Sequence, residues 1–186
     1  QMASLGNGNV LVYGGITVGS TYLNDAWVFS FSTAQWTHTT DGPGARAGHQ
    51  MASLGNGNVL MYGGSNGTDL NDAWVFSFST AQWTQTTDGP GTRYNSNQMA
   101  SLGNGKVLMC GYWDSGTDGT SSSFNNAYIF GLGNNKNPLW TALPNQAIGA
   151  RSDFSMISIA DSNHLLLFGG KVRTRNGLGQ TTAFQN

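Results

Sequence analysis

Hydrophobic and polar residues alternate in short runs along this chain, and glycines or polar turns separate the runs. In residues 50–91 an apolar run, MASL, ends at Gly-Asn-Gly (55–57), a tight turn that favours positive φ. The next run, VLMYGG (59–64), is almost entirely apolar, as expected of a strand covered on both faces. AWVFSF (73–78) alternates with a period of two, and QWTQTT (82–87) is polar. The pattern therefore predicts four strands, with the fourth at a solvated edge.

This pattern occurs four times along the chain. Residues 1–44 repeat the segment just described nearly letter for letter. The Gln-Met start recurs at Gln1, Gln50 and Gln98, and a looser copy begins at Ser155. A period near 50 residues with four strand signals per unit is typical of a β-propeller. We divide the chain into blades of residues 1–48, 49–96, 97–152 and 153–186, the last of them incomplete.

At these residues the sequence resembles the kelch family of β-propellers. The resemblance rests on the double glycine that ends the second strand and on LNDAWVFSFSTAQW after it. A tryptophan recurs in the fourth strand, at Trp36, Trp83 and Trp140. Arg46-x-x-His49 is similar to the family's Arg-x-x-His ahead of the innermost strand, and the resemblance extends to about Lys171. It implies an all-β, kelch-type propeller of about three and a half four-stranded blades.

The third and fourth units depart from the pattern. Unit three reads MCGYWD where a double glycine is expected. We therefore expect Cys110 to take the first glycine position, with a backbone conformation there that is less strained than in the other units. Tyr128 replaces the tryptophan of the third strand, and residues 112–125 are expected to form a longer loop. Unit four is expected to stop after its second strand.

The predicted number of blades leaves the ring incomplete. Propellers close with about four to eight blades, and an open arc would leave apolar faces and sheet edges in water. We therefore expect these residues to be part of a longer chain that closes the ring. A homodimer sharing one ring is the alternative, and the objection to it is that neither copy would supply the outer strands of unit four.

Composition and charge limit the class of partner. Charged residues make up 9% of the chain, against roughly 25% in an average domain. The net charge of −1 provides no field that would attract nucleic acid or an anionic membrane. No apolar run approaches the roughly 20 residues that a membrane span needs. The expected partner is thus a protein or a glycan.

Low charge and abundant Asn and Thr favour a secreted or cell-surface protein. Asn66-Gly67-Thr68 forms a sequon, which makes Asn66 a candidate glycosylation site. The single cysteine rules out a disulfide framework within this segment.

Candidate chemistry is sparse. The three histidines show no ligand spacing, and all nine acidic residues are aspartates. Most of these aspartates lie in turns, and the repetition of Asp25 as Asp72 and of Asp41 as Asp88 indicates that they cap turn N–H groups. We predict no catalytic residue, no metal and no cofactor in this segment.

Ligand contacts in a propeller come from the loops that differ between blades. The segment 112–125 holds Trp113, Asp114 and Asp118, and Trp113 has no counterpart in the other units. A tryptophan beside aspartates and hydroxyls can stack on a sugar ring or anchor a peptide. The alternative is a tryptophan that packs beneath a long loop.

Three arginines, Arg46, Arg93 and Arg151, recur just before the innermost strands, near one mouth of the expected central channel. The resemblance to kelch adaptor domains implies that arginines here bind acidic peptides, because guanidinium groups clamp carboxylates in a bidentate manner. The alternative is that these arginines hydrogen-bond to carbonyl groups of the neighbouring blade.

The favoured function is a non-catalytic kelch propeller that binds a protein or glycan ligand or serves as a structural module. LGNGNVLVYGG is also similar to kelch sequences of the galactose-oxidase type, so a copper-radical oxidase is the alternative. That enzyme would need a Tyr–Cys cross-link, a second tyrosine and two histidines. Cys110 and Tyr112 are too close in sequence for the cross-link, so such a site would lie largely outside this segment.

Overall fold

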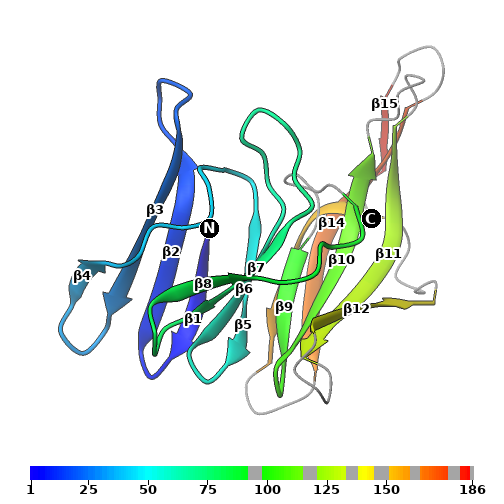
Figure 1. Ribbon diagram of the computed structural model, residues 1–186. Helices are drawn as coiled ribbons and strands as arrows, with labels where there is room; N and C mark the ends of the chain where they lie inside the picture. Colours follow the sequence, from blue (N-terminus) through cyan, green and yellow to red (C-terminus); the bar gives the residue numbers. More distant parts are fainter. Residues whose placement is uncertain are drawn as a thin grey trace.

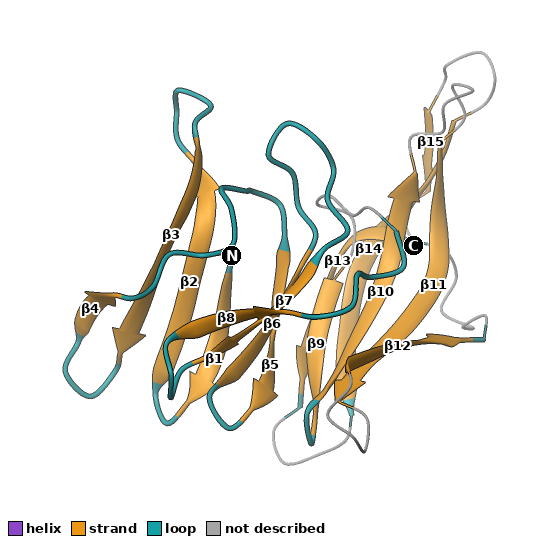
Figure 2. Cartoon of the chain, in the orientation of Figure 1, coloured by secondary structure: helices purple, strands orange, loops and turns teal. Residues whose placement is uncertain are grey.

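The computed structural model describes residues 1–91, 98–114, 121–132, 138–144, 151–159, 164–175 and 181–184. These residues form fifteen strands joined by loops and turns, and they contain no helix (Figure 2). The described part accordingly has no helix that could cross a membrane. The all-β class predicted from the sequence is confirmed.

Units one and two each form one antiparallel sheet of four strands in chain order. The first sheet consists of β1 (Met2–Gly6), β2 (Asn9–Ile16), β3 (Tyr22–Ser30) and β4 (Gln35–His38). The second consists of β5 (Gln50–Gly55), β6 (Asn58–Tyr62), β7 (Ala73–Ser77) and β8 (Gln82–Gln85). The fourth strands are almost fully exposed, as the polar QWTQTT pattern predicted.

Units three and four join into one seven-stranded sheet, because β11 pairs with β14. Unit three supplies β9 (Gln98–Gly103), β10 (Lys106–Asp114), β11 (Ser121–Leu132) and β12 (Pro138–Leu143). Unit four supplies β13 (Ser152–Ser158), β14 (Leu165–Arg175) and β15 (Thr181–Phe184).

The sheets stand side by side in a fan, with the first strand of each unit next to the first strand of the following unit (Figure 1). Strands β1, β5, β9 and β13 line the inner side of this arc. The arrangement confirms the predicted propeller blades, and the ring is not closed in this chain.

Each blade has two apolar faces, because successive side chains of a strand point to opposite sides of the sheet. We call one the leucine face; in blade one it carries Ala3, Leu5, Leu11, Tyr13, Ala26 and Val28. We call the other the methionine face; in blade two it carries Met51, Val59, Met61, Trp74, Phe76 and Trp83. These two faces pack against each other in one cluster, and each large side chain buried there contributes roughly 1.5–3 kcal/mol.

The register of unit three corrects the position assigned to Cys110. Cys110 pairs with the residues that correspond to the partners of Tyr62 in unit two, so it occupies the tyrosine position. Gly111, with φ of 79°, is the first glycine, in the same conformation as Gly63 with φ of 67°. Tyr112 therefore takes the second glycine position. The expectation was wrong because the strand was aligned one residue out of step.

Two further expectations about units three and four were wrong. The described residues of the segment 112–125 are strand, because β10 continues to Asp114 and β11 begins at Ser121. Pairing of Ser121 and Ser122 with β14 extends this long hairpin into the next blade. Unit four also does not stop after its second strand, since β15 pairs with β14 as a third strand.

Candidate binding face

The loops between second and third strands lie at the same end of the blades as the crossings from each fourth strand to the next blade (Figure 1). We call this end the upper face. A backbone hydrogen bond of 2.9 Å from Gly15 N–H to the Arg46 carbonyl ties a crossing to the end of β2. The upper face therefore combines loops that differ between blades with crossings that repeat.

The hairpin of blade one presents an ordered apolar tip on the upper face. Its turn is fixed by hydrogen bonds from Thr17 N–H to Thr21 O at 3.0 Å and from Ser20 N–H to Thr17 O at 2.9 Å. The Thr17 hydroxyl also accepts from Thr21 N–H at 3.2 Å. Ile16 is 50% exposed and Val18 is fully exposed. The tip thus holds two apolar side chains in water on a backbone that is already fixed.

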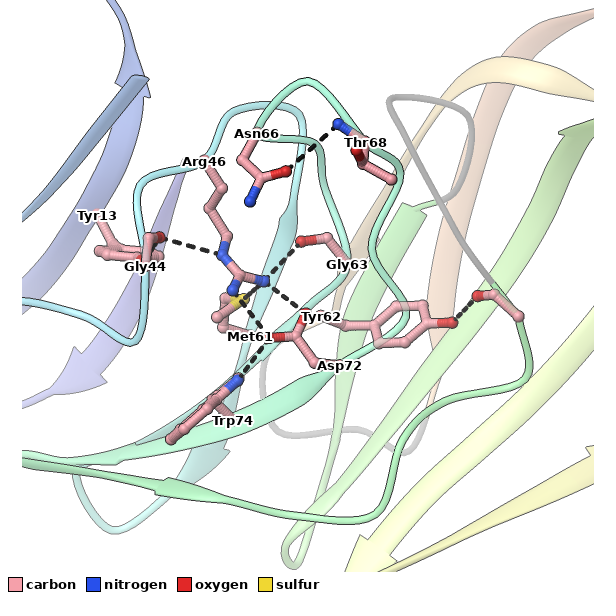
Figure 3. Close-up of polar contacts among 11 residues, drawn as sticks. Tyr13, Gly44, Arg46, Met61, Tyr62, Gly63, Asn66, Thr68, Asp72 and Trp74 are labelled. Atoms are coloured by element: carbon pink, nitrogen blue, oxygen red, sulfur yellow. Dashed lines mark hydrogen bonds and ion pairs between the residues drawn. The ribbon is translucent and has the colours of Figure 1, made fainter. Parts of the chain in front are cut away.

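The corresponding loop of blade two is polar. Asn66 Oδ1 accepts from Thr68 N–H at 3.3 Å, and Asn66 N–H donates to the Thr68 carbonyl at 3.4 Å (Figure 3). Residues 66–69 are exposed, and a bridge between Ser65 and Asp69 closes the turn. The sequon therefore lies in a tight exposed turn, and glycosylation of Asn66 stays a prediction.

Arg46 lies beneath these loops and is only 4% exposed. Its Nη1 and Nη2 atoms donate to the two carboxylate oxygens of Asp72 at 2.6 and 2.8 Å. Nη1 also donates to the Gly63 carbonyl at 3.0 Å, and Nε donates to the Gly44 carbonyl at 3.3 Å (Figure 3). A ligand carboxylate would have to displace Asp72, so these contacts match the alternative in which the arginine bonds to carbonyl groups of the blades.

Asp72 links this arginine to the third strand. Its carboxylate also accepts from the indole N–H of Trp74 at 2.7 Å, and Asp25 accepts from Trp27 in the same way at 2.6 Å. Burial alone would raise the pKa of the Asp72 carboxyl, but the hydrogen bonds from Arg46 and Trp74 and the charge on Arg46 hold that pKa below its usual value. The repeated aspartate is structural, as predicted, but its partners are side chains rather than turn N–H groups.

A tyrosine at the end of the second strand secures each of the first two crossings. Tyr13 Oη donates to the Gly44 carbonyl, and Tyr62 Oη donates to the Gly91 carbonyl. Gly42 packs so closely on the Tyr13 ring that a Cβ atom there would overlap it, and Gly89 does the same on Tyr62. The Asp-Gly-Pro-Gly turns are therefore clamped by the preceding tyrosine, a contact that the sequence analysis missed.

His49 is a core residue of this crossing. Its ring is fully buried, 5.1 Å from the ring of Tyr13. Burial lowers the pKa of His49 to about 3, and the positive charge of Arg46 adds to the effect. In blade four, Ser155 corresponds to Gln50, so the preceding residue, Phe154, corresponds to His49. Phe154 is 3% exposed. The imidazole at this position is therefore packed as an apolar group.

We expect acid to destabilise the protein through His49. Because the folded-state pKa of about 3 lies below the unfolded value near 6.5, the unfolded chain binds protons more readily. The stability is full above pH 6.5 and falls as the pH drops toward 3, with a loss of about 2 kcal/mol between pH 7 and pH 5. His49→Phe should remove this loss in urea unfolding at the two pH values. An unchanged pH dependence in the variant would contradict the assignment.

The structure describes only some of the remaining residues that were predicted to bind a ligand. Arg151 Nη1 donates to the Gly169 carbonyl at 3.1 Å, the same contact that Arg46 makes with Gly63. Trp113 and Asp114 lie in β10, and their side chains are outside what the structure describes. Arg93 and Asp118 lie outside the described residues.

The described residues hold no group of three or more His, Cys, Asp or Glu side chains that could bind a metal ion. Cys110 is buried with its sulfur 3.7 Å from the sulfur of Met156, and burial raises the pKa of its thiol to about 11.

A shallow hollow of about 200 Å³ lies between the innermost strands. Its lining consists of small and apolar side chains from all four blades, with serine hydroxyls at equivalent positions, Ser4, Ser53, Ser101 and Ser158. Because these serines repeat in every blade, they belong to the scaffold and do not single out a ligand.

The fan of blades, the clamped crossings and the variable loops together define a kelch-type propeller, a class of protein-binding scaffold. The sequence model of the KLHDC2/KLHL20/DRC7 Kelch-repeats domain matches residues 1–112, more than half of the chain. The chain therefore belongs to this kelch-repeat family. No curated protein matches it.

Proposed function

We propose that the chain is a non-catalytic binding module that holds a partner protein against its upper face. The observation that carries the proposal is the ordered apolar tip of blade one, where Ile16 and Val18 are exposed on a turn fixed by three hydrogen bonds. A pre-ordered apolar contact loses little entropy on binding, which is typical of an interface anchor.

The partner surface follows from the neighbouring loops. Blade two presents the polar turn of residues 66–69 beside the apolar tip, and the upper hairpin of blade three carries Trp113 and Asp114. We infer a partner with a small apolar pocket that receives the side chains of Ile16 and Val18. The same partner makes polar contacts with the turn of blade two. A glycan ligand and a secreted location stay predictions.

Peptides selected from a random display library on the wild-type chain provide a test. They should bind the double variant Ile16→Ser/Val18→Ser at least about tenfold more weakly, a loss of about 1.4 kcal/mol, because the apolar anchor is gone. Phe31→Ser is the matched control, since Phe31 is 79% exposed in the β3–β4 turn at the opposite end of the blade. Selected peptides that ignore the double variant but lose affinity for Phe31→Ser would overturn the proposal.

A further inference from the structure

Two hollows lie between blades one and two, toward the end of the blades opposite the upper face. The β1–β2 and β3–β4 turns and their equivalents in blade two lie at this end (Figure 1). The first hollow, of about 360 Å³, lies between the leucine face of blade one, at its outer strands, and the turn after β7. The second, of about 310 Å³, lies between the β1–β2 and β5–β6 turns. Both volumes fall within the roughly 300–1,000 Å³ of small-molecule sites.

Phe78 lines both hollows, together with Asn9, and we call the two hollows the lower groove. The N–H of Phe78 donates to the Gly57 carbonyl at 2.9 Å. Gly57 packs closely on this side chain, because a Cβ atom there would lie 3.3 Å from the Cβ atom of Phe78. Phe78 is nevertheless 42% exposed. The lower groove therefore presents an aromatic ring on a backbone that is already fixed.

Amide groups from the hairpin turns and hydroxyl groups from the outer part of blade one make up most of the remaining lining. They include Asn7, Asn9, Asn56, Ser30, Thr37 and Thr39. The Asn9 amide is held in place, since its Nδ2 donates to the Asn7 carbonyl at 3.4 Å. This contact leaves the amide oxygen of Asn9 as an acceptor for a ligand.

Charge is almost absent from the lower groove. Of the described residues that line it, His38 is the only titratable one, and its Nε2 pairs with the Asp41 carboxylate at 2.9 Å. The larger aliphatic side chains of the lining, Leu5 and Val28, are only 4% and 7% exposed. An anionic ligand therefore finds no lysine or arginine in this lining, and an apolar peptide side chain finds no open pocket to fill.

We propose that the lower groove binds an uncharged oligosaccharide. A sugar ring carries C–H groups on its faces and hydroxyl groups around its edge. The C–H face stacks on Phe78, and the hydroxyl groups donate to and accept from the amide and hydroxyl groups of the lining. Because the two hollows share Phe78, a ligand of at least two linked sugars occupies both. The site lies at the opposite end of the blades from the protein-binding upper face, so the two ligands bind independently.

The junction between blades two and three provides an internal comparison. By the register of β10 with β11, Leu132 of blade three corresponds to Phe78. Asn58 of blade two takes the place of Asn9. The polar lining thus belongs to the repeated scaffold, whereas the aromatic ring distinguishes the first junction from the second.

Saturation-transfer NMR and titration calorimetry with defined sugars test the proposal. The probes are four neutral trisaccharides, cellotriose, maltotriose, mannotriose and chitotriose, with sialyllactose as the acidic comparison. The wild-type chain should bind at least one neutral probe. Phe78→Ala and Phe78→Leu should each bind that probe at least about tenfold more weakly, because both remove the flat ring, whereas Phe78→Tyr should retain the affinity. Retained affinity in Phe78→Leu would show that apolar bulk suffices and that no sugar ring stacks there.

Phe31→Ala is the matched control, since Phe31 is the equivalent residue of blade one and lines neither hollow. This variant and Ile16→Ser/Val18→Ser should bind the sugar as the wild type does, which separates the lower groove from the upper face. A thermal unfolding scan shows that each variant is folded. The proposal is overturned if the wild type binds none of the neutral probes, if it prefers sialyllactose, or if Phe78→Ala binds equally well. Loss of the display-selected peptides in Phe78→Ala would likewise overturn it, because the groove would then hold a protein partner.

Discussion

Gly64→Ala is expected to lower the free energy of unfolding by about 2–5 kcal/mol, because it strains the backbone and forces a collision. Gly64 has φ of +92°, which L-residues rarely adopt. A Cβ atom there would lie 2.7 Å from the Ala47 carbonyl oxygen and 2.9 Å from His49 N. Both neighbours are backbone atoms of the crossing, so neither can move aside without shifting the first strand of the blade.

Gly67→Ala is the matched control for this substitution. Gly67 also has positive φ, +107°, but no atom lies within 4 Å of the position that a Cβ atom would take there. Only the conformational cost remains, roughly 1–2 kcal/mol. Urea unfolding followed by tryptophan fluorescence gives both values. Equal losses for the two variants would show that the close approach of the crossing to Gly64 contributes nothing.

The repeated parts of the fold could be predicted from the sequence because the signals are local. The alternation in AWVFSF and the Gly-Asn-Gly turn each depend on a few adjacent residues, and the structure has β7 and the β5–β6 turn in those places. The propeller arrangement could be predicted from the near-identity of units one and two, because near-identical units fold alike and pack against their neighbours in the same way.

The partners of the repeated side chains could not be predicted, since they lie in different turns. Arg46 and Asp72 are 26 residues apart, and nothing near either residue shows that they pair. The units do carry a signal that was not used. Unit three has Asn126 and Tyr128 where unit two has Asp72 and Trp74, so acceptor and indole donor change together.

A second coordinated change concerns the tyrosine clamp. Tyr13 and Tyr62 each precede a crossing with an Asp-Gly-Pro-Gly turn. Unit three has Cys110 at the tyrosine position, and residues 142–152 contain no such turn. Residues that change as a set between units identify contacts, whereas residues that change alone, such as those of the hairpin tips, identify surface that is free to differ.

Arg46, which the resemblance to kelch adaptor domains offered as a ligand contact, is expected to act as a structural residue. Arg46→Met is expected to cost about 2–4 kcal/mol of stability, because removing one partner of a buried ion pair leaves the other charge unpaired. The loss of stability in Arg46→Met should be nearer the lower value of this range, because the side chain of Asp72 is 22% exposed and keeps its hydrogen bond from Trp74. Asp72→Asn should cost a similar amount, because it leaves the buried charge of Arg46 without a counter-charge and turns an amide N–H toward one guanidinium nitrogen.

The double variant Arg46→Met/Asp72→Asn separates a scaffold role from a binding role. If the two side chains act on each other, its loss in urea unfolding should be smaller than the sum of the single losses by about 1 kcal/mol or more. The display-selected peptides should bind Arg46→Met with unchanged affinity at a temperature where the variant is folded. If stability is retained and peptide affinity is lost, Arg46 binds the partner in solution and the ion pair with Asp72 opens to admit it.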